Sequence, residues 1–435
     1  MQIKSTNKIK VIPQIINVKL SNLSSFLNSI ITEYENLFYF SNPIDNYEFI
    51  ALGKIFSSNY DLNELENEYS NLYELLDFKF NEFNINKLPI VIGYHKFPSK
   101  IIDEIWSDFK DSEWIIPQYI FLRNKDATYL INFFDDSNQI KLEQLVEESN
   151  FRNSTNSKFG KLYQKETDDF VKWKNFVSEA IDLIKNGRLS KIVVSRKKQF
   201  KLLSEIDYSG LFETINKTYP DCFNFLIKSN NSIFFGSTPE LLVQLEKNRF
   251  KSEALAGSIR RGLNDYEDKY YSELLLSDKK NLLEHQIVVD YLQSQLSNIV
   301  TNFYVDDKPK IKKLRNIQHL NTEVFGEILP EKNIFHIIKT IFPTPAVCGI
   351  PKQVALDELA NIERFERGIF TGILGWLNFN SQAEFCVALR CGLVYKNYLT
   401  AFAGCGIVEN SVDIDEFNET ELKINSIIDF FDVEY

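Results

Sequence analysis

Apolar positions recur at helical spacing soon after residue 165. They stand three or four residues apart, the period of one helix face, and are Phe170, Trp173, Val177, Ile181 and Ile184. Thr167 or Asp168 can cap this helix, and Gly187 can end it. The same spacing predicts a long helix over 278–296 and a final helix over 415–431.

Short β-branched and aromatic runs predict strands between these helices. The first run is KIVVSR (191–196). Two more runs, 223–228 and 232–236, flank Asn230–Asn231, a favourable hairpin turn. Near the end, 383–394 and 397–404 predict a pair of strands. Because strands and helices mix without strict βαβ alternation, the pattern favours an α+β architecture.

Composition narrows the classes of protein. The chain has 435 residues, 44% of them hydrophobic, with 49 Lys+Arg against 60 Asp+Glu. It can bury a large core, and a net charge of −11 argues against nucleic-acid binding. No apolar stretch reaches the length of a membrane span, so we expect a cytoplasmic protein with no membrane partner. The polar stretch 148–161 predicts an exposed loop, and the composition changes near it.

Cysteine and histidine usage does not indicate zinc. The five cysteines contain no CxxC pair, and there are four histidines. We expect reduced cysteines that pack as small hydrophobic residues.

Carboxylates on two of the expected helices suggest metal chemistry. Glu284 shares a helix face with Val288 and Tyr291, where a carboxylate is costly unless a cation or hydrogen-bond donors satisfy it. Glu416 and Glu419 are three residues apart and so face one way. Such a pair suits Mg²⁺. Acidic residues in a first helical turn also interact favourably with the helix dipole, and the spacing alone leaves both interpretations open.

Glycines and basic residues could hold an anion. Gly404 and Gly406 close a predicted strand, and their backbone N–H groups could bind a carboxylate, although by themselves they are better explained by a tight turn. Arg390, at the end of a predicted strand, could clamp a carboxylate or lie on the surface. By itself Lys191 is a strand-end lysine, and Glu240 is a turn residue after a proline.

Nine ordered blocks make the stretch 165–435 resemble the chorismate-utilising enzyme family. They are KIVVSR (191–196), FFGSTPELL (234–242), EALAGSIRRG (253–262), SDKKNLLEH (277–285), QHLNTEVFGEI (318–328), PTPAVCGIPK (343–352), ERGIFTGILGW (366–376), ALRCGLV (388–394) and AGCGIV (403–408) followed by EFNETELK (416–423). The resemblance implies a single large α+β domain of stacked antiparallel sheets wrapped by helices. In it, residues 1–160 would form a variable half and 161–435 the motif-bearing half.

The resemblance also implies roles for individual residues. Lys191 would be the base that activates water, and Glu240 the acid that protonates the leaving hydroxyl. Mg²⁺ would be held by Glu284, Glu416 and Glu419. The remaining matched positions would bind the substrate, chorismate: Gly257, Ser258, His319, Arg390, Gly404, Gly406 and Lys423.

A few positions favour the isochorismate synthase branch, whose product serves menaquinone or siderophore synthesis. Relatives that use ammonia tend to have glutamine where Lys191 stands, so no glutaminase partner is expected. PTPAVCG (343–349) and Phe370 differ from the salicylate branch, and Asn281 replaces an acidic residue that some relatives have near the metal. A bifunctional salicylate synthase and a non-catalytic binding protein are the alternatives. We expect a monomer or weak dimer.

Overall fold

The computed structural model describes most of the chain. The described residues are 9–11, 14–18, 22–59, 61–62, 64–67, 69, 76–78, 87–124, 127–133, 158–164 and 169–435. The expected helix cap at Thr167 or Asp168, and residues 148–157 of the expected loop, lie outside them.

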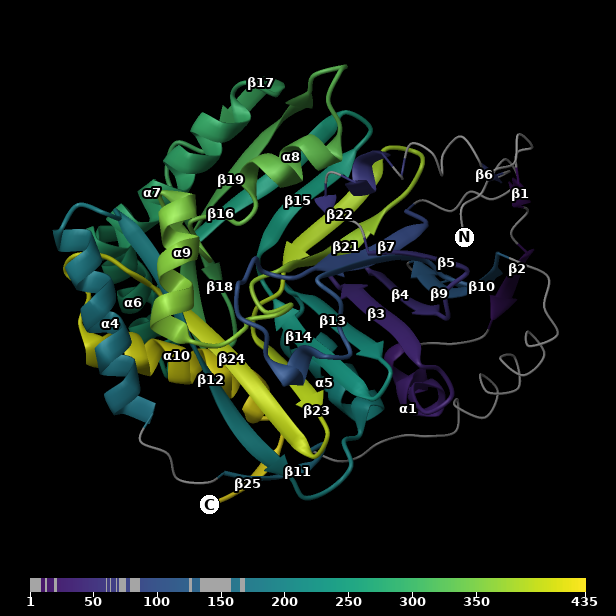
Figure 1. Ribbon diagram of the computed structural model, residues 1–435, viewed down its shortest axis with the longest axis horizontal. Coiled ribbons are helices and arrows are strands. Elements are labelled where there is room, and N and C mark those ends of the chain that lie inside the picture. The colour runs from purple at the N-terminus through teal and green to yellow at the C-terminus, as the bar shows by residue number, and fades with distance from the viewer. Residues whose placement is uncertain are drawn as a thin grey trace.

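Two large sheets organise these residues (Figure 1). The larger sheet runs in the order β2 (Gln14–Val18), β10 (Ala127–Asn132), β9 (Tyr119–Asn124), β4 (Tyr47–Leu52), β3 (Asn36–Asn42), β13 (Phe223–Ser229), β14 (Ser232–Thr238), β23 (Cys391–Tyr395), β24 (Tyr398–Ile407), β12 (Lys191–Leu202), β11 (Lys161–Tyr163) and β25 (Asp432–Glu434), with β20 (Gly349–Ile350) also on β12.

The second sheet runs in the order β17 (Val300–Val305), β19 (Ile317–Ile328), β16 (Arg249–Arg260), β15 (Leu241–Glu246), β22 (Gln382–Val387), β21 (Ile373–Leu377), β7 (Val91–His95), β8 (Ser112–Ile116) and β5 (Phe56–Ser58), with β18 (Lys310–Lys313) also on β19. Described pairings within the two large sheets are antiparallel except β11 with β25. The short strands β1 (Ile9–Val11) and β6 (Leu76–Phe78) form a separate parallel pair.

The helices cover the outer faces. They are α1 (Leu27–Ile31), α4 (Asp169–Lys185), α5 (Tyr208–Thr218), α6 (Asp265–Ser277), α7 (Lys279–Leu296), α8 (Ile334–Ile341), α9 (Lys352–Glu363) and α10 (Asp413–Ile428), with one-turn 3₁₀ helices at Ser24–Phe26 and Glu104–Trp106. In Figure 1, α4, α9 and α10 gather around β12 and β24. None of the described helices is long and apolar enough to cross a membrane.

Alternation along β3 explains why the larger sheet is buried on both faces. Phe38 and Phe40 enter the core between the two sheets, whereas Leu37 and Tyr39 enter a second core under α1, α5 and α10. Successive side chains of a strand point to opposite faces, so a continuous apolar run belongs to a doubly covered strand. The α+β, single-domain prediction is confirmed.

The local predictions hold for most elements. The helix after residue 165 is α4, with Trp173 and Val177 buried, and Gly187 follows it in the left-handed conformation. The expected strand over 383–394 is wrong as a single element, because it divides into β22 and β23. β22 belongs to the second sheet and β23 to the larger one. The chain changes sheets at residues 388–390, and a run of apolar residues carries no signal of that change.

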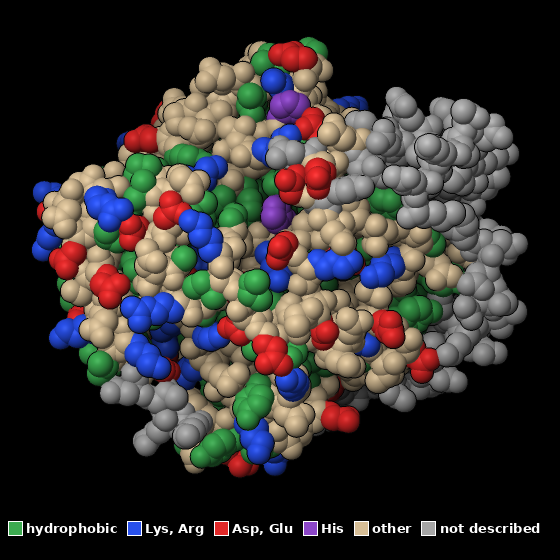
Figure 2. Space-filling view, viewed as in Figure 1, with side chains coloured by type: hydrophobic (Ala, Val, Ile, Leu, Met, Phe, Trp, Pro, Cys, Tyr) green, Lys and Arg blue, Asp and Glu red, His purple; other side chains and the backbone are tan. Residues whose placement is uncertain are grey.

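Acidic and basic side chains are interspersed over the face in Figure 2. The five cysteines are free and buried, as predicted.

Candidate active site

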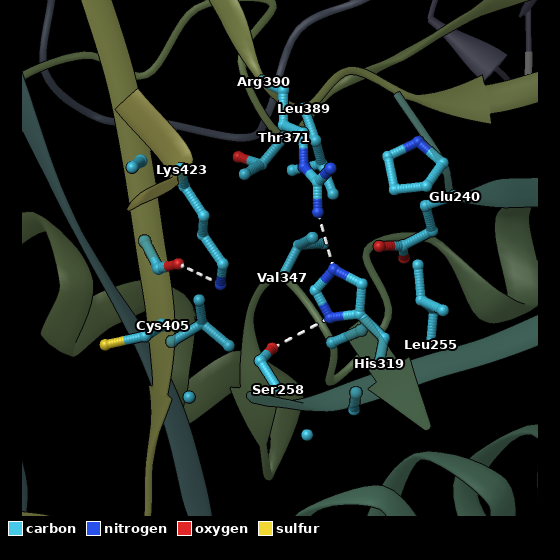
Figure 3. Close-up of a pocket in the computed structure, with 18 of the residues that line it drawn as sticks. Glu240, Leu255, Ser258, His319, Val347, Thr371, Leu389, Arg390, Cys405 and Lys423 are labelled. Atoms are coloured by element: carbon cyan, nitrogen blue, oxygen red, sulfur yellow. Dashed lines mark hydrogen bonds between the residues drawn. The ribbon is translucent and has the colours of Figure 1, made fainter. Parts of the chain in front are cut away.

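Most of the predicted site residues line one cavity where the two sheets meet (Figure 3). Strands β16 and β19 form one wall, and β24 forms another. The predicted residues on the cavity wall are Glu240, Gly257, Ser258, Glu284, His319, Arg390, Gly404, Gly406 and Lys423. Lys191 and Glu419 lie behind this wall and reach it through their partners Glu284 and Lys423, whereas Glu416 pairs with Lys280, which is not on the wall.

Arg390 lies where the chain passes from β22 to β23. Its φ is 46°, a left-handed value that is uncommon for a residue with a side chain. Arg390 is therefore not at the end of a strand, as the sequence predicts. The turn between the two sheets holds its guanidinium inside the cavity, where Arg390 is 5% exposed. Its Nη1 is buried without a hydrogen-bond partner. Such a group is costly to bury alone and is suited to receive an anionic ligand.

His319 connects Arg390 to Ser258. Arg390 Nη2 lies 2.6 Å from His319 Nε2, and Ser258 Oγ lies 2.9 Å from His319 Nδ1. Because a guanidinium only donates, Nε2 must accept, and the ring proton is on Nδ1 and points at Ser258. Burial, with Arg390 next, holds the pKa of His319 well below its usual range. His319 is therefore a neutral residue of fixed tautomer.

The hydrogen-bond chain continues from Ser258 to β24. Ser258 helps to lower the pKa of Glu419, Glu419 Oε1 lies 2.7 Å from Lys423 Nζ, and Lys423 donates to the Gly404 carbonyl at 2.9 Å. Asn281 Oδ1 accepts from the Ser258 backbone N–H at 3.0 Å, so this residue fixes the strand rather than adding a carboxylate. The chain joins β16, β19, α10 and β24 around one space.

Glu240 lies in the turn between β14 and β15 and is 4% exposed. Burial raises its pKa to about 8, against the opposing effect of Lys191. The side chain is therefore mostly protonated at neutral pH, which a general acid requires.

Lys191 is fully buried beside Glu284. Its Nζ lies 3.1 Å from Glu284 Oε1. Gly406 makes this pair possible, because a Cβ at that position would lie 2.1 Å from Glu284 Oε1 and 2.7 Å from Lys191 Cε. The structure thus gives Gly406 a steric role besides the predicted contact with substrate.

Each predicted metal ligand is paired with a lysine. Glu284 pairs with Lys191, Glu419 with Lys423 and Glu416 with Lys280. Burial, with Glu419 next, raises the pKa of Glu416. Burial alone would raise the pKa of Glu419 too, but Lys423 lowers it below its usual value. Within the described residues, no three His, Cys, Asp or Glu side chains converge closely enough to form a ready metal site.

The cavity is narrow with these lysines in place. Its volume is about 70 Å³, below the roughly 300 Å³ at the lower end of small-molecule pockets. Lys423 has a long flexible side chain on the cavity wall and is the residue best able to move aside. Entry of a ligand therefore requires the ion pairs to open.

Three residues that touch this site were missed by sequence reasoning. Lys280 stands four residues before Glu284 on the same helix face, so spacing could have indicated it. Arg367 is 1% exposed and donates to the carbonyls of Val193 and Val347, both on the cavity wall. Lys312 donates to the carbonyl of Pro239 at 2.7 Å. Neither Arg367 nor Lys312 had a local signal, since their partners are distant in the sequence.

A buried carboxyl with a raised pKa, a buried lysine behind the wall and a guanidinium with one unpaired nitrogen around one cavity are typical of an enzyme for a small anionic molecule. The chain belongs to the chorismate binding enzyme family, whose model matches residues 1–432.

Similar proteins cover most of the chain. Isochorismate synthase MenF of Bacillus subtilis (strain 168) is 28% identical over 427 residues, which span 93% of this chain and 90% of that protein. Isochorismate synthase MenF of Haemophilus influenzae is 32% identical over 325 residues, 74% of this chain and 75% of that protein. The structure of MenF, the menaquinone-specific isochorismate synthase from Escherichia coli, covers 98% of this chain and 96% of its own with a TM-score of 0.76. At 22% identity, that likeness shows the shared fold.

Proposed function

We propose that the protein is an isochorismate synthase, which converts chorismate to isochorismate by adding water at C2 and expelling the C4 hydroxyl. The observation that carries this proposal is the combination of a buried Lys191 with a protonated Glu240 at one cavity. The names of the relatives and the family match support the same reaction.

The substrate carboxylates would be held by the polar groups of the cavity wall. Arg390 Nη1 has no hydrogen-bond partner among the described residues, so it is available for a charge-assisted hydrogen bond. Lys423, once released from the Gly404 carbonyl, would supply a second cation. His319 stays neutral and holds Arg390 by accepting from it, so the guanidinium faces the ligand in one orientation.

Lys191 and Glu240 would move the protons. Neutral Lys191 takes a proton from water while the water oxygen bonds to C2. The C4–O bond breaks, and Glu240 gives its proton to the departing oxygen. The reverse reaction uses the same two groups in exchanged roles, so the conversion is reversible and needs neither ammonia nor a redox cofactor.

Three carboxylates support magnesium as the cofactor. Burial would lower the pKa of Lys280, but Glu416, Glu284 and Glu419 together raise it, so all three carboxylates act on one cation. Oxygen ligands of this kind suit Mg²⁺. When bound, magnesium would neutralise charge on a substrate carboxylate.

The cavity wall favours this reaction over the salicylate alternative. Phe370 lines the cavity and stacks on Phe402 with ring centroids 5.4 Å apart, so the side chain at this position offers no hydroxyl. Ala346 and Val347 of the PTPAVCG block are apolar neighbours.

Incubation with chorismate and Mg²⁺, followed by chromatography of the products, tests the proposal. Isochorismate in equilibrium with chorismate is the expected result, and pure isochorismate should give the same mixture. Salicylate and pyruvate as main products would assign the rival reaction. Binding of chorismate without turnover would support the non-catalytic alternative.

A further inference from the structure

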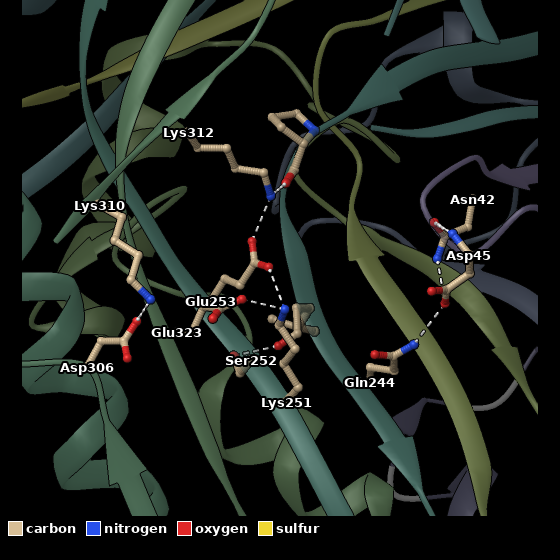
Figure 4. Close-up of polar contacts among 12 residues, drawn as sticks. Asn42, Asp45, Gln244, Lys251, Ser252, Glu253, Asp306, Lys310, Lys312 and Glu323 are labelled. Carbon is tan, nitrogen blue, oxygen red and sulfur yellow. Dashed lines mark hydrogen bonds and ion pairs between the residues drawn. The ribbon is translucent and has the colours of Figure 1, made fainter. Parts of the chain in front are cut away.

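Lys312 contacts the peptide that carries Glu240. Its Nζ donates to the Pro239 carbonyl at 2.7 Å and lies 2.8 Å from Glu253 Oε2 (Figure 4). The Lys312 side chain is 17% exposed and that of Glu253 is 8% exposed. One ammonium thus joins the backbone next to the acid to a largely buried carboxylate.

The neighbouring strands fix Lys312 in place. Lys312 on β18 stands opposite His319 on β19, and Glu253 on β16 stands opposite Glu323 on β19. Lys251 Nζ lies 2.5 Å from Glu323 Oε1 and 3.5 Å from Glu253 Oε1. Glu253 is therefore held by a lysine on each side, and the alternating charges form a row that ends beside Glu240.

Charged groups from four elements act on Glu240. Lys191 on β12, Lys312 on β18 and Lys423 on α10 favour its carboxylate form, whereas Glu253 on β16 favours its protonated form. Cys386 on β22 also faces it. Of these three cations, Lys312 is the one that also binds the backbone of the Glu240 turn. Unlike Lys191 and Lys423, it takes no part in the proposed proton transfer or carboxylate binding.

We propose that Lys312 is a positioning residue for the reaction: it fixes the Pro239–Glu240 peptide and, balanced by Glu253, sets how tightly Glu240 holds its proton. This inference rests on the proposed function, in which Glu240 is the acid. It assigns Lys312 and Glu253 opposite electrostatic effects on one group. A purely structural role would not produce opposite effects.

The test is the pH profile of kcat for chorismate in four variants and the wild type. Lys312→Met should move the alkaline limb to higher pH by about one pH unit and lower kcat on the order of tenfold, since the acid is less well placed. KM should change little. Glu253→Gln should move the same limb to lower pH. Lys312→Arg keeps the charge and the donor and should restore most of the wild-type profile.

Lys310→Met is the matched control, because Lys310 on the same strand pairs with Asp306 at 2.8 Å, away from the Glu240 turn. Its profile should match the wild type. The inference is overturned if the alkaline limb stays fixed in Lys312→Met and Glu253→Gln, or if it moves in the same direction in both. In that case a wild type that forms isochorismate still supports the proposed function. A wild type that forms no isochorismate overturns both. Thermal unfolding of each variant checks folding, and Lys312→Arg keeps the test decisive if Lys312→Met unfolds.

Discussion

Lys191 Nζ lies 3.1 Å from Glu284 Oε1, so the proposed base and a proposed metal ligand form one ion pair. The lysine side chain is 0% exposed and the glutamate side chain 11%. A carboxylate at this distance stabilises the ammonium, and an ammonium cannot accept a proton. The proposed base and the proposed metal ligand therefore share one contact, and a cation bound at Glu284 would compete with Lys191 for the same carboxylate.

Replacing Lys191 with methionine should abolish most turnover without abolishing binding. The side chain keeps its bulk but loses the group that activates water, and general-base catalysis is worth about 10²–10⁴-fold. We expect kcat to fall by that factor, while the Kd of chorismate, measured by calorimetry, changes little. Lys201→Met, at the exposed end of the same strand, is the control. Wild-type turnover in Lys191→Met would exclude Lys191 as the base.

Magnesium binding should compete with Lys280. Because Lys280 pairs with Glu416 and feels all three carboxylates, Lys280→Met should tighten Mg²⁺ binding on the order of tenfold in the absence of substrate. Glu419→Gln should weaken it by a similar factor or more, with loss of turnover. Isothermal titration with Mg²⁺ measures both constants directly.

The control for this experiment is Lys279→Met, an exposed neighbour on the same helix, which should bind Mg²⁺ as the wild type does. If Lys280→Met binds the ion no more tightly than Lys279→Met, Lys280 does not occupy the metal position. If Glu419→Gln keeps the wild-type affinity, Glu419 is not a ligand.

Arg390→Lys should impair binding of chorismate more than chemistry. The guanidinium uses Nη2 on His319 and leaves Nη1 buried and unpaired, and a single ammonium cannot serve both directions. Loss of a charge-assisted hydrogen bond costs about 1.5–3 kcal/mol, so KM should rise by roughly 10- to 150-fold. Arg249→Lys, with a side chain 82% exposed, should show no change. An unchanged KM in Arg390→Lys would remove Arg390 from the carboxylate site.

Glu384 should make stability depend on pH. It is 1% exposed; its Oε2 accepts from Asn42 and Gln244, and Oε1 has no partner. Burial raises its pKa to about 7, so the folded protein holds this proton more tightly than the unfolded chain. Its contribution is present below pH 4.5 and is lost as the pH rises through 7, on the order of 3 kcal/mol.

Urea unfolding from pH 5 to 8 measures this effect. The wild type should lose stability across the range more steeply than Glu384→Gln, whose amide cannot ionise. Glu246→Gln, at the exposed end of β15, should keep the wild-type slope. Parallel slopes for wild type and Glu384→Gln would show that Glu384 does not ionise in this range.

The sequence by itself determined the local elements and the chemistry of the blocks. An amphipathic helix has its apolar residues at a 3.6-residue period within one stretch of chain, so the sequence predicted α4, α7 and α10. The hairpin of β13 and β14 followed from Asn230–Asn231 and its flanking apolar runs. Lys191, Glu240 and Arg390 were singled out because matched blocks preserve residue types in order.

The tertiary structure decided what those residues touch. Residues 383–394 divide between two sheets because their two parts have different neighbours. β22 lies between β15 and β21, and β23 lies between β14 and β24. The pairs Lys191–Glu284 and Lys280–Glu416 and the contact of Lys312 with Pro239 join segments far apart in sequence. A linear pattern encodes periodicity along one segment, whereas ion pairs and the protonation of Glu240 depend on burial and charge brought together by folding.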